Sequence, residues 1–482
     1  MGYKSRTKPF PHQAKEYNDH RKKDVRALLW QMRSGKTKAI IDLAEYRFSI
    51  GDITGLVIMA PNGVHDNWAR RELPRHCSTL YRAAVYRSSQ RNTKSHKYAF
   101  DRLMKTPRGQ LAVLCINSET IWREPAKKVL GEFMRQHSGK LMLCVDESHD
   151  FRTPGSKRTR TARGYAKQCR VKRIMTGTTV SNSPLAAWSQ FEILQPGALG
   201  FHTHAEFKAE YAIYEMRKLK GGKQFSQLVD YRNLDDLTQR ISKWSSVVLR
   251  QDCKGMPDLN PSYRGFEMTD EQRKLYDQVK KTGILDEMDL TGAAKMTKLQ
   301  QITRGWYYDE FKEVHDVVPD EKNPALIALL DEIKGSNGKV IVWCRFKVDL
   351  NKVQAMLQRE GINFVMYRGG MSGDAKNIAM NKYMENPAIK VFLGQPQSGG
   401  VGLNLAAGTT IIWFSHVFDL IIYEQASERA TQVDGSTIDV IHIEAVRSTD
   451  QYIISTLADH RDVAAAVTGS GLRTVLDLEE LI

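Results

Sequence analysis

The chain of 482 residues has few cysteines and no long apolar run. Its six cysteines are scattered without a CxxC pair, and several lie in apolar stretches, which favours buried free thiols over a disulfide framework or a zinc site. No apolar run could span a bilayer, and residues 1–24 are basic and polar, unlike a secretion signal. These absences predict a globular protein of the cytoplasm, or of the host cytoplasm if the protein is viral.

Acidic residues are also missing from one long stretch. Between Asp150 and Glu192 there is none, whereas nine lysines and arginines fall in that window, and the whole chain carries a net charge of +16. A solvated basic face is the plain explanation. Because the stretch follows a pair of carboxylates and the whole chain is basic, a polyanionic partner, above all nucleic acid, is favoured.

A phosphate-binding loop is predicted at "QMRSGKT", residues 31–37. The segment follows an apolar run, residues 25–30, and precedes "KAIIDLAEY", which has helical spacing. Backbone N–H groups at the start of such a helix attract phosphate oxygens. We expect the loop residues Arg33, Ser34 and Gly35 to surround the phosphates, Lys36 to reach the β- and γ-phosphates, and the Thr37 hydroxyl to hold Mg²⁺.

An acidic partner for this loop follows in "CVDESHD", residues 144–150. Residues 140–145 read as a buried strand that ends in two adjacent carboxylates. Asp146 is expected to hold the metal, and Glu147 to activate the attacking water. The two segments together predict that the chain binds ATP with Mg²⁺ and hydrolyses it.

Apolar runs and helical patterns alternate along the two ends of the chain. Four strands are expected at residues 55–60, 110–116, 140–145 and 171–176, and a second series begins at "VIVWCRF" after the turn-rich "KGSNGK". Residues between them are helical and charged. The predicted fold is α/β, with parallel sheets covered by helices, in three parts: an ATP-binding domain at 1–196, a helical insertion and linker at 197–335, and a second α/β domain at 336–482.

The order of further segments resembles the Swi/Snf-type branch of the superfamily-two helicase-like ATPases, in a compact form like those encoded by bacteriophages. The resemblance covers nearly the whole chain and rests on these segments: "KPFPHQ", "GLVIMAPNGVHDNWARREL", "VLCINSE", "DESH" (similar to a DEAH-type motif), "MTGTTVSNSPLAAWSQFEILQPGALG", "VVLRQDCKGMPDLNP", "KVIVWCRFKVDL", "SGGVGLNLAAGTTIIWFS" and "QASERATQVDG". It implies two RecA-like domains in tandem, with the helical insertion between motifs III and IV, and a cleft in which ATP is hydrolysed.

The resemblance also implies roles for single residues. Gln13 would read the adenine, Gly402 would approach the nucleotide, and Gln425 and Arg429 would face the γ-phosphate. DNA contacts are implied for the following residues of motifs Ia, III and V: Asn67, Trp68, Thr176, Gly177, Thr178, Ser398, Gly399 and Asn404. For Trp68, packing is favoured over contact with nucleic acid.

Two departures from the family pattern bear on activity. Arg33 stands where the family loop has glycine, so either it carries strain at positive φ or the loop is rearranged. Gln432 replaces the second arginine of motif VI, which leaves Arg429 as the arginine finger.

Three functions remain open at this point. The first is an ATP-driven motor on duplex or branched DNA in replication, recombination or repair. The second is a helicase that separates strands of forked or single-stranded nucleic acid, and the third is a nucleotide-gated DNA-binding scaffold with little turnover. Protein partners are not indicated by any segment.

Overall fold

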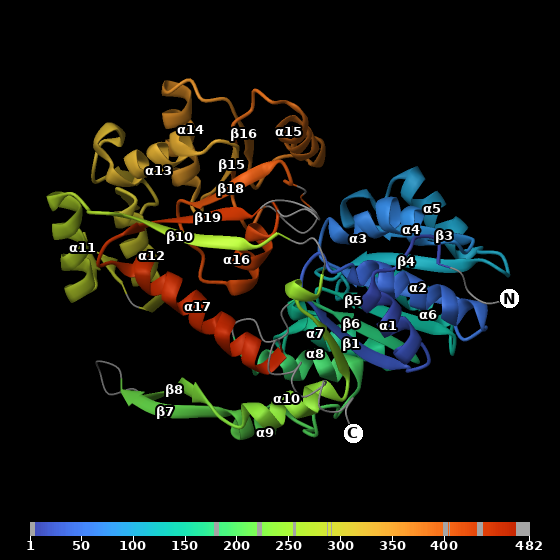
Figure 1. Ribbon diagram of the computed structural model, residues 1–482. Coiled ribbons are helices and arrows are strands. Elements are labelled where there is room, and N and C mark those ends of the chain that lie inside the picture. Colours follow the sequence, from blue (N-terminus) through green and yellow to red (C-terminus); the bar gives the residue numbers. More distant parts are fainter. Residues whose placement is uncertain are drawn as a thin grey trace. The chain divides into compact units, whose positions relative to one another are not determined.

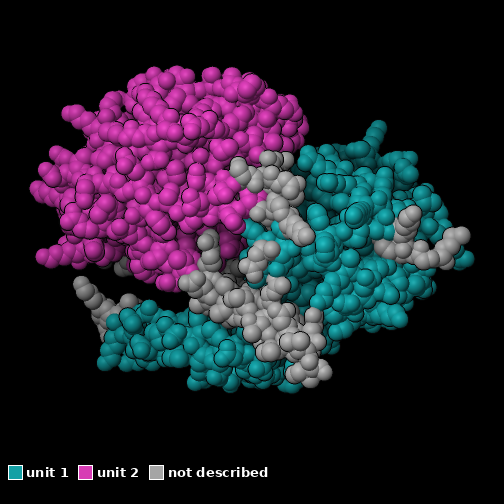
Figure 2. Space-filling model, viewed as in Figure 1, with its two compact units in different colours: residues 1–253, 460–482 teal, residues 254–459 magenta. Residues whose placement is uncertain are grey.

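The computed structural model describes residues 5–177, 183–218, 224–253, 257–286, 288–290, 292–398, 403, 405–430 and 437–468. The chain divides into two compact units, which Figure 2 shows in teal and magenta: unit 1 is Met1–Cys253 with His460–Ile482, and unit 2 is Lys254–Asp459. Within the described residues, no helix is both long and apolar enough to cross a membrane.

Unit 1 is built on a seven-stranded sheet in the order β3-β4-β2-β5-β6-β1-β9, in which every neighbouring pair is parallel. The strands are β1 (Val25–Trp30), β2 (Gly55–Ala60), β3 (Tyr81–Tyr86), β4 (Leu111–Asn117), β5 (Leu141–Asp146), β6 (Val171–Met175) and β9 (Ser245–Val248). The inner strands β2, β4, β5 and β6 are buried along their whole length, as expected for a parallel sheet with both faces covered. All four strands expected from the sequence of this half are confirmed.

Helices connect and cover these strands (Figure 1). They are α1 (Pro11–His20), α2 (Lys36–Ser49), α3 (Val64–Asn67), α4 (Leu73–His76), α5 (Lys94–Met104), α6 (Glu124–Gln136), α7 (Lys157–Ala166), α8 (Ala186–Leu194), α9 (His204–Tyr211) and α10 (Leu234–Ser242). Because all strands run in one direction, the segments after β1, β5 and β6 leave from the same edge of the sheet. These are the predicted phosphate loop, the carboxylate pair and motif III.

Unit 2 holds a second, six-stranded parallel sheet in the order β10-β19-β18-β15-β17-β16. Its strands are β10 (Leu259–Phe266), β15 (Lys339–Trp343), β16 (Phe364–Tyr367), β17 (Val391–Gly394), β18 (Gly408–Trp413) and β19 (Ile438–Ala445). Its helices are α11 (Asp270–Thr282), α12 (Gly292–Thr303), α13 (Pro324–Gly335), α14 (Lys347–Arg359), α15 (Gly373–Glu385), α16 (Leu420–Ser427) and α17 (Thr449–Thr468), the last of which starts in this unit. The predicted α/β fold with two parallel-sheet domains is confirmed.

The structure divides residues 197–335 differently from the expected helical insertion. The segment supplies β9 to the first sheet and β10 to the second, and α11, α12 and α13 contribute side chains to the core of unit 2. It also forms three two-stranded antiparallel pairs: β7 (Ala212–Lys218) with β8 (Gln224–Tyr231), β11 (Ile284–Leu285) with β12 (Met288–Asp289), and β13 (Trp306–Tyr308) with β14 (Val314–Asp316). Both units are therefore completed by residues from this segment.

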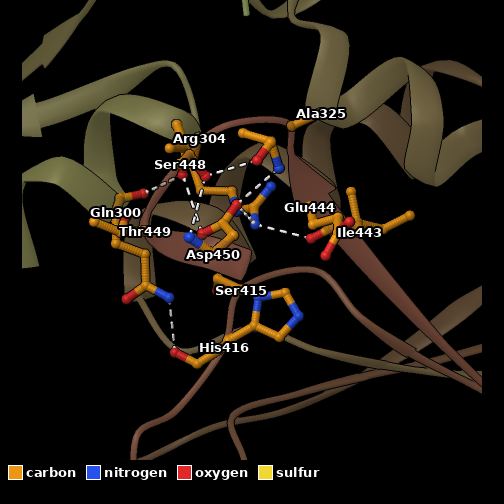
Figure 3. Close-up of polar contacts among 12 residues, drawn as sticks. Gln300, Arg304, Ala325, Ser415, His416, Ile443, Glu444, Ser448, Thr449 and Asp450 are labelled. Atoms are coloured by element: carbon orange, nitrogen blue, oxygen red, sulfur yellow. Dashed lines mark hydrogen bonds and ion pairs between the residues drawn. The ribbon is translucent and has the colours of Figure 1, made fainter. Parts of the chain in front are cut away.

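A buried ion pair fixes the start of α17 in unit 2 (Figure 3). Arg304, just after α12, donates from Nη2 to Asp450 Oδ2 at 2.7 Å and to the carbonyl oxygen of Ile443 at 3.0 Å, and both charged side chains are 0% exposed. The Asp450 carboxylate also accepts from the backbone N–H of Ala445 at 3.0 Å. Phe266 and Phe414 lie against the guanidinium. The pair thus ties α12, β19 and α17 together inside the core.

We expect Arg304→Met to cost about 3–5 kcal/mol of the free energy of unfolding of unit 2, because it leaves the Asp450 carboxylate buried without a cation. The double variant Arg304→Met/Asp450→Leu removes both charges and should recover most of that loss. Urea unfolding, monitored through hydrogen exchange of the β19 amides, measures the free energy of unfolding of both variants. A double variant as unstable as the single one would contradict the assignment.

Candidate nucleotide-binding site

The loop after β1 has the geometry of a phosphate-binding turn. Gly35 is the N-cap of α2 with φ 81°, in the left-handed region that favours glycine, and α2 then runs for 14 residues from Lys36. The N–H groups at the start of this helix carry the positive end of its dipole and attract anions. The loop predicted from the sequence therefore exists, with the predicted helix behind it.

Arg33 in this loop has φ 61°, so the strained alternative for this position is confirmed. A residue with a Cβ pays about 1–2 kcal/mol in this region, and such strain persists where the surrounding structure fixes the backbone. The position puts a cationic side chain in the loop that is predicted to bind phosphate.

Two substitutions separate strain from charge at this position. Arg33→Gly and Arg33→Ala both remove the guanidinium, but only glycine relieves the backbone, so we expect the glycine variant to be the more stable of the two by about 1 kcal/mol. Both variants should bind ATP more weakly than the parent chain if Arg33 attracts phosphate. Thermal unfolding without nucleotide and calorimetric titration with ATP measure the two effects. An alanine variant more stable than the glycine variant would contradict the claim that the backbone at Arg33 is strained.

Residues of the N-terminal segment hold the loop from outside. The Gln13 side chain is 2% exposed and donates from Nε2 to the carbonyl oxygen of Gly35 at 2.9 Å, while its Oε1 accepts from the backbone N–H of Phe10 at 2.8 Å. His12 Nε2 lies 2.7 Å from the carbonyl oxygen of Ser34, and the Ser34 hydroxyl donates to the carbonyl oxygen of Gln31. Gln13 thus shapes the loop directly, and its expected contact with adenine stays a prediction.

The Lys36 ammonium lies beneath the loop. It donates to the carbonyl oxygens of Trp30 at 2.7 Å and Gln31 at 3.2 Å, and the side chain is 8% exposed. Those carbonyls keep the charge at the end of β1, within the loop that a phosphate would enter.

The carboxylates after β5 lie one strand away from β1 across β6. The Asp146 carboxylate accepts from the indole N–H of Trp68 at 2.8 Å and from the backbone N–H of Glu147 at 2.9 Å. Trp68 is 1% exposed, and it starts the π-helical turn Trp68–Glu72 between α3 and α4. This burial supports the packing interpretation of Trp68 and does not fit a direct DNA contact.

Glu147 is the second non-glycine residue of the site with a left-handed backbone, with φ 50° and a side chain 6% exposed. Its Oε2 lies 3.3 Å from His149 Nδ1, and the same ring nitrogen lies 3.0 Å from the hydroxyl of Thr176, the residue after β6. Burial lowers the pKa of His149, but the hydrogen bond and charge of Glu147 outweigh it, so the pKa is raised. The predicted base is therefore linked through one histidine to motif III.

The buried carboxylate pair is suited to a divalent cation. Burial and the charge of Glu147 together raise the pKa of Asp146 to about 7, against the opposing effects of the Trp68 hydrogen bond and the Lys36 charge. Mg²⁺ bound beside Asp146 would favour the ionised form. Asp146 and Thr37, the second residue of α2, are the residues that would hold it, since Mg²⁺ prefers oxygen ligands and keeps phosphate and water in its remaining positions.

The other DNA-contact candidates are placed as follows. Asn67 donates to Glu72 Oε1 at 3.3 Å, Gly177 lies against Met32 of the phosphate loop, and Ser398 follows β17 with its carbonyl oxygen accepting from Lys376 at 3.4 Å. Thr176 is 0% exposed. Thr178, Gly399, Gly402, Asn404 and Gln432 lie outside the described residues.

In unit 2, the motif VI candidates lie on and just after α16. Gln425 is in that helix, and the Arg429 carbonyl oxygen accepts from the backbone N–H of Leu405 at 3.1 Å. Burial raises the pKa of Tyr367, the last residue of β16, and the positive charge of Arg429 partly opposes it. The Arg429 charge therefore lies near the carboxyl ends of the strands of this sheet.

In the folded chain, acidic side chains from other segments lie beside residues 151–191, which contain no acidic residue themselves. Arg173 is 1% exposed and donates to backbone carbonyls of Lys23 and Asp24. Arg163 pairs with Glu192 at 2.6 Å, and Arg170 pairs with Asp24 at 3.1 Å. Part of this charge is thus structural, and the stretch offers less free positive surface than its composition indicates.

Sequence reasoning missed two contributors to the site. His12 holds the loop through Ser34, and Gln190 of α8 accepts from the Ser148 hydroxyl at 2.7 Å behind the carboxylates. Both residues lie inside quoted segments, His12 in "KPFPHQ" and Gln190 in the segment that begins at Met175. The contact of Gln190 was not predictable, because its partner is 42 residues away.

Two family models match adjacent parts of the chain. The SNF2-related domain model matches residues 23–307, more than half of the chain, and the helicase conserved C-terminal domain model matches residues 321–433. The chain belongs to the SNF2-related family. The resemblance stated from the motifs is thereby confirmed.

Individual relatives are distant and longer. The chain is 24% identical over 412 residues to the DNA repair and recombination protein RDH54 of Saccharomyces cerevisiae, covering 78% of this chain and 42% of the relative. It is 22% identical to the probable ATP-dependent DNA helicase CHR12 of Arabidopsis thaliana (92% and 40%) and 23% identical to the uncharacterized ATP-dependent helicase MG018 of Mycoplasma genitalium (64% and 29%). The chain thus spans less than half the length of these relatives.

Among solved structures, the chain is similar to a Sulfolobus solfataricus SWI2/SNF2 ATPase core in complex with dsDNA. The identity is 19% and the TM-score 0.41, and the alignment covers 100% of this chain and 97% of that one.

Proposed function

We propose that this member of the SNF2-related family is an ATP-dependent motor that translocates on, or remodels, duplex or branched DNA during replication, recombination or repair. The observation that carries the proposal is the meeting of three segments at one edge of the first sheet. The phosphate loop follows β1, the carboxylates follow β5, and Thr176 follows β6, which lies between those two strands. ATP with Mg²⁺ is the ligand that this combination of groups suits.

The chemistry follows from the residues. Lys36 and the start of α2 hold phosphate oxygens, Thr37 and Asp146 hold Mg²⁺, and Glu147 orients and deprotonates the attacking water. The His149 contact with both Glu147 and Thr176 is a physical link by which a change at the γ-phosphate reaches motif III. Arg429 supplies the charge that stabilises the transition state. The affinity for ATP would differ between two arrangements of the units, and this difference would drive movement along DNA.

The proposal is tested by the ATPase rate in the presence of duplex, forked and single-stranded DNA and of RNA. Duplex should stimulate at least as well as single strands. Best stimulation by RNA would point to an RNA helicase, and no stimulation by any of them would favour the low-turnover scaffold. A strand-displacement assay on forked DNA separates translocation from unwinding.

DNA affinity should fall steeply with salt because the chain carries a net charge of +16. Each phosphate that a cationic side chain neutralises releases counterions, so several such contacts lower the affinity about 10³-fold or more between 50 and 200 mM salt. Fluorescence anisotropy of a labelled duplex measures the slope. A binding constant that does not change over this range would remove the electrostatic argument.

A further inference from the structure

A groove of about 1060 Å³ lies on unit 2, whereas the phosphate loop and its carboxylates belong to unit 1. It is lined by α11, α12, the start of α17 and the residues that follow β15 and β18. Every element that forms it belongs to unit 2. Of its lining residues, Arg345 lies in the quoted segment "KVIVWCRFKVDL", and the others lie outside the quoted segments.

The lining is basic, and none of its sixteen residues is acidic. Its cations are Lys280, Lys295, Arg345 and Arg447. Arg447 forms an ion pair with Glu267, at 3.1 Å from Nη2 to Oε2. Both side chains are largely exposed, and ion pairs of this kind contribute little to stability. A positive groove of this kind attracts an anion.

Aromatic and apolar side chains line the same groove. Phe418 lies 5.3 Å from the Arg345 guanidinium, and Tyr452 is 59% exposed, so its ring is accessible to a ligand. Met296 and Leu299 of α12 add apolar surface. Aromatic rings beside cations are the usual means by which proteins hold a base and its phosphate.

Hydrogen bonds hold the Arg345 side chain in the wall of the groove, and Figure 3 shows one bond of this set, from Gln300 to His416. The Arg345 guanidinium donates to Gln300 Oε1 at 2.5 Å, and Gln300 donates to the carbonyl oxygen of His416 at 2.9 Å. Thr449, the first residue of α17, is 7% exposed, and its backbone N–H donates to the Tyr276 hydroxyl at 2.8 Å. It stands at the end of a helix that favours negative charge.

We propose that this groove binds a nucleoside phosphate, with the base against Phe418 and Tyr452 and the phosphate near Arg447 and the start of α17. The ligand is either a free nucleotide or an unpaired nucleotide of a DNA strand. This is a second nucleotide site, separate from the phosphate loop. Binding of a ligand to it does not depend on ATP hydrolysis.

Photochemical labelling of the full chain tests the proposal. The probes are 8-azidoadenosine 5′-monophosphate and a single-stranded oligodeoxynucleotide that carries 5-iodouracil, and labelled peptides are mapped by mass spectrometry. We expect label on the peptides that contain Phe418 or Tyr452. Label from the oligonucleotide identifies a strand as the source, and label from the monophosphate alone identifies a free nucleotide.

Substitutions make the test quantitative. Tyr452→Ala and Arg447→Gln should each lower the affinity for the labelled probe at least about fivefold, because each removes a stacking or phosphate contact. Tyr263→Ala is the matched control, since Tyr263 is also 59% exposed and lies on β10 of the same unit outside the groove. Basal ATPase without DNA should be unchanged in all three variants.

Two results would overturn the proposal. One is label from both probes that avoids these peptides. The other is binding of an acidic, aromatic peptide at the groove with no nucleotide label, which would make it a protein-docking surface. Neither result depends on whether DNA stimulates the ATPase, so failure here is distinguishable from failure of the proposed function.

Discussion

Glu147→Gln is expected to abolish ATP hydrolysis while ATP still binds. Glutamine keeps the shape of the side chain but cannot take a proton from water, and loss of a general base costs about 10²–10⁴ in rate. The buried position of Glu147, 3.3 Å from His149 and one residue from the metal-binding candidate Asp146, supports the assignment. Phosphate release at saturating DNA and calorimetric titration with ATP measure the two properties.

Lys36→Ala provides the contrast, because it removes a charge that acts on bound phosphate as well as on the transition state. That variant should lose ATP affinity together with turnover. Asp150→Asn is a suitable control within the same segment, since Asp150 faces Ser118 and Arg158 and not the phosphate loop. Equal loss of ATP binding in the Glu147 and Lys36 variants would contradict the separate roles.

Arg429→Ala is expected to be nearly inactive even though it lies in the other unit. The γ-phosphoryl group becomes metaphosphate-like in the transition state, and a planar, permanently charged guanidinium stabilises it well. Where an arginine finger is the main stabiliser, its loss costs on the order of 10³–10⁵ in rate. The chain has glutamine at position 432, so of these two positions only Arg429 would supply a charge.

Steady-state ATPase at saturating DNA measures this effect. Gln432→Ala should keep most of its turnover, because glutamine supplies no charge. Arg359→Ala is the control for loss of a positive charge in the same unit, since Arg359 ends α14 and pairs with the exposed Glu321. Near-normal turnover of Arg429→Ala would remove Arg429 from the role of finger.

Periodicity predicted the inner strands well and the edge strands poorly. Residues 55–60 are an apolar run that coincides with a buried strand, and residues 171–175 form a buried strand although they include Lys172 and Arg173. β10 was not expected because six of its eight residues are exposed and it contains Pro261, which only an edge position tolerates. β9 has four residues, too few to show any alternation. These two strands account for the different division of residues 197–335.

The site was predicted in its residues but not in its contacts. The phosphate loop and carboxylates were found because their residue types and strand context are specific. The bond from Trp68 to Asp146 joins residues 78 apart, and no pattern along the chain encodes it. The left-handed backbone of Glu147 was equally invisible, because it is set by the surrounding structure and not by a glycine.

The attachment of β9 to β1 has a mechanical consequence. β9 is the last strand of unit 1 before the chain enters unit 2, and it pairs in parallel with β1 from Ala27 with Ser245 to Trp30 with Val248. The pairing continues into the phosphate loop, because Gln31 donates its backbone N–H to the carbonyl oxygen of Val248 at 2.9 Å and accepts from the backbone N–H of Arg250. A pull along the axis of β9 would load these bonds in shear, all at once, and would not peel them singly. Such a force would act directly on the strand that carries the phosphate loop.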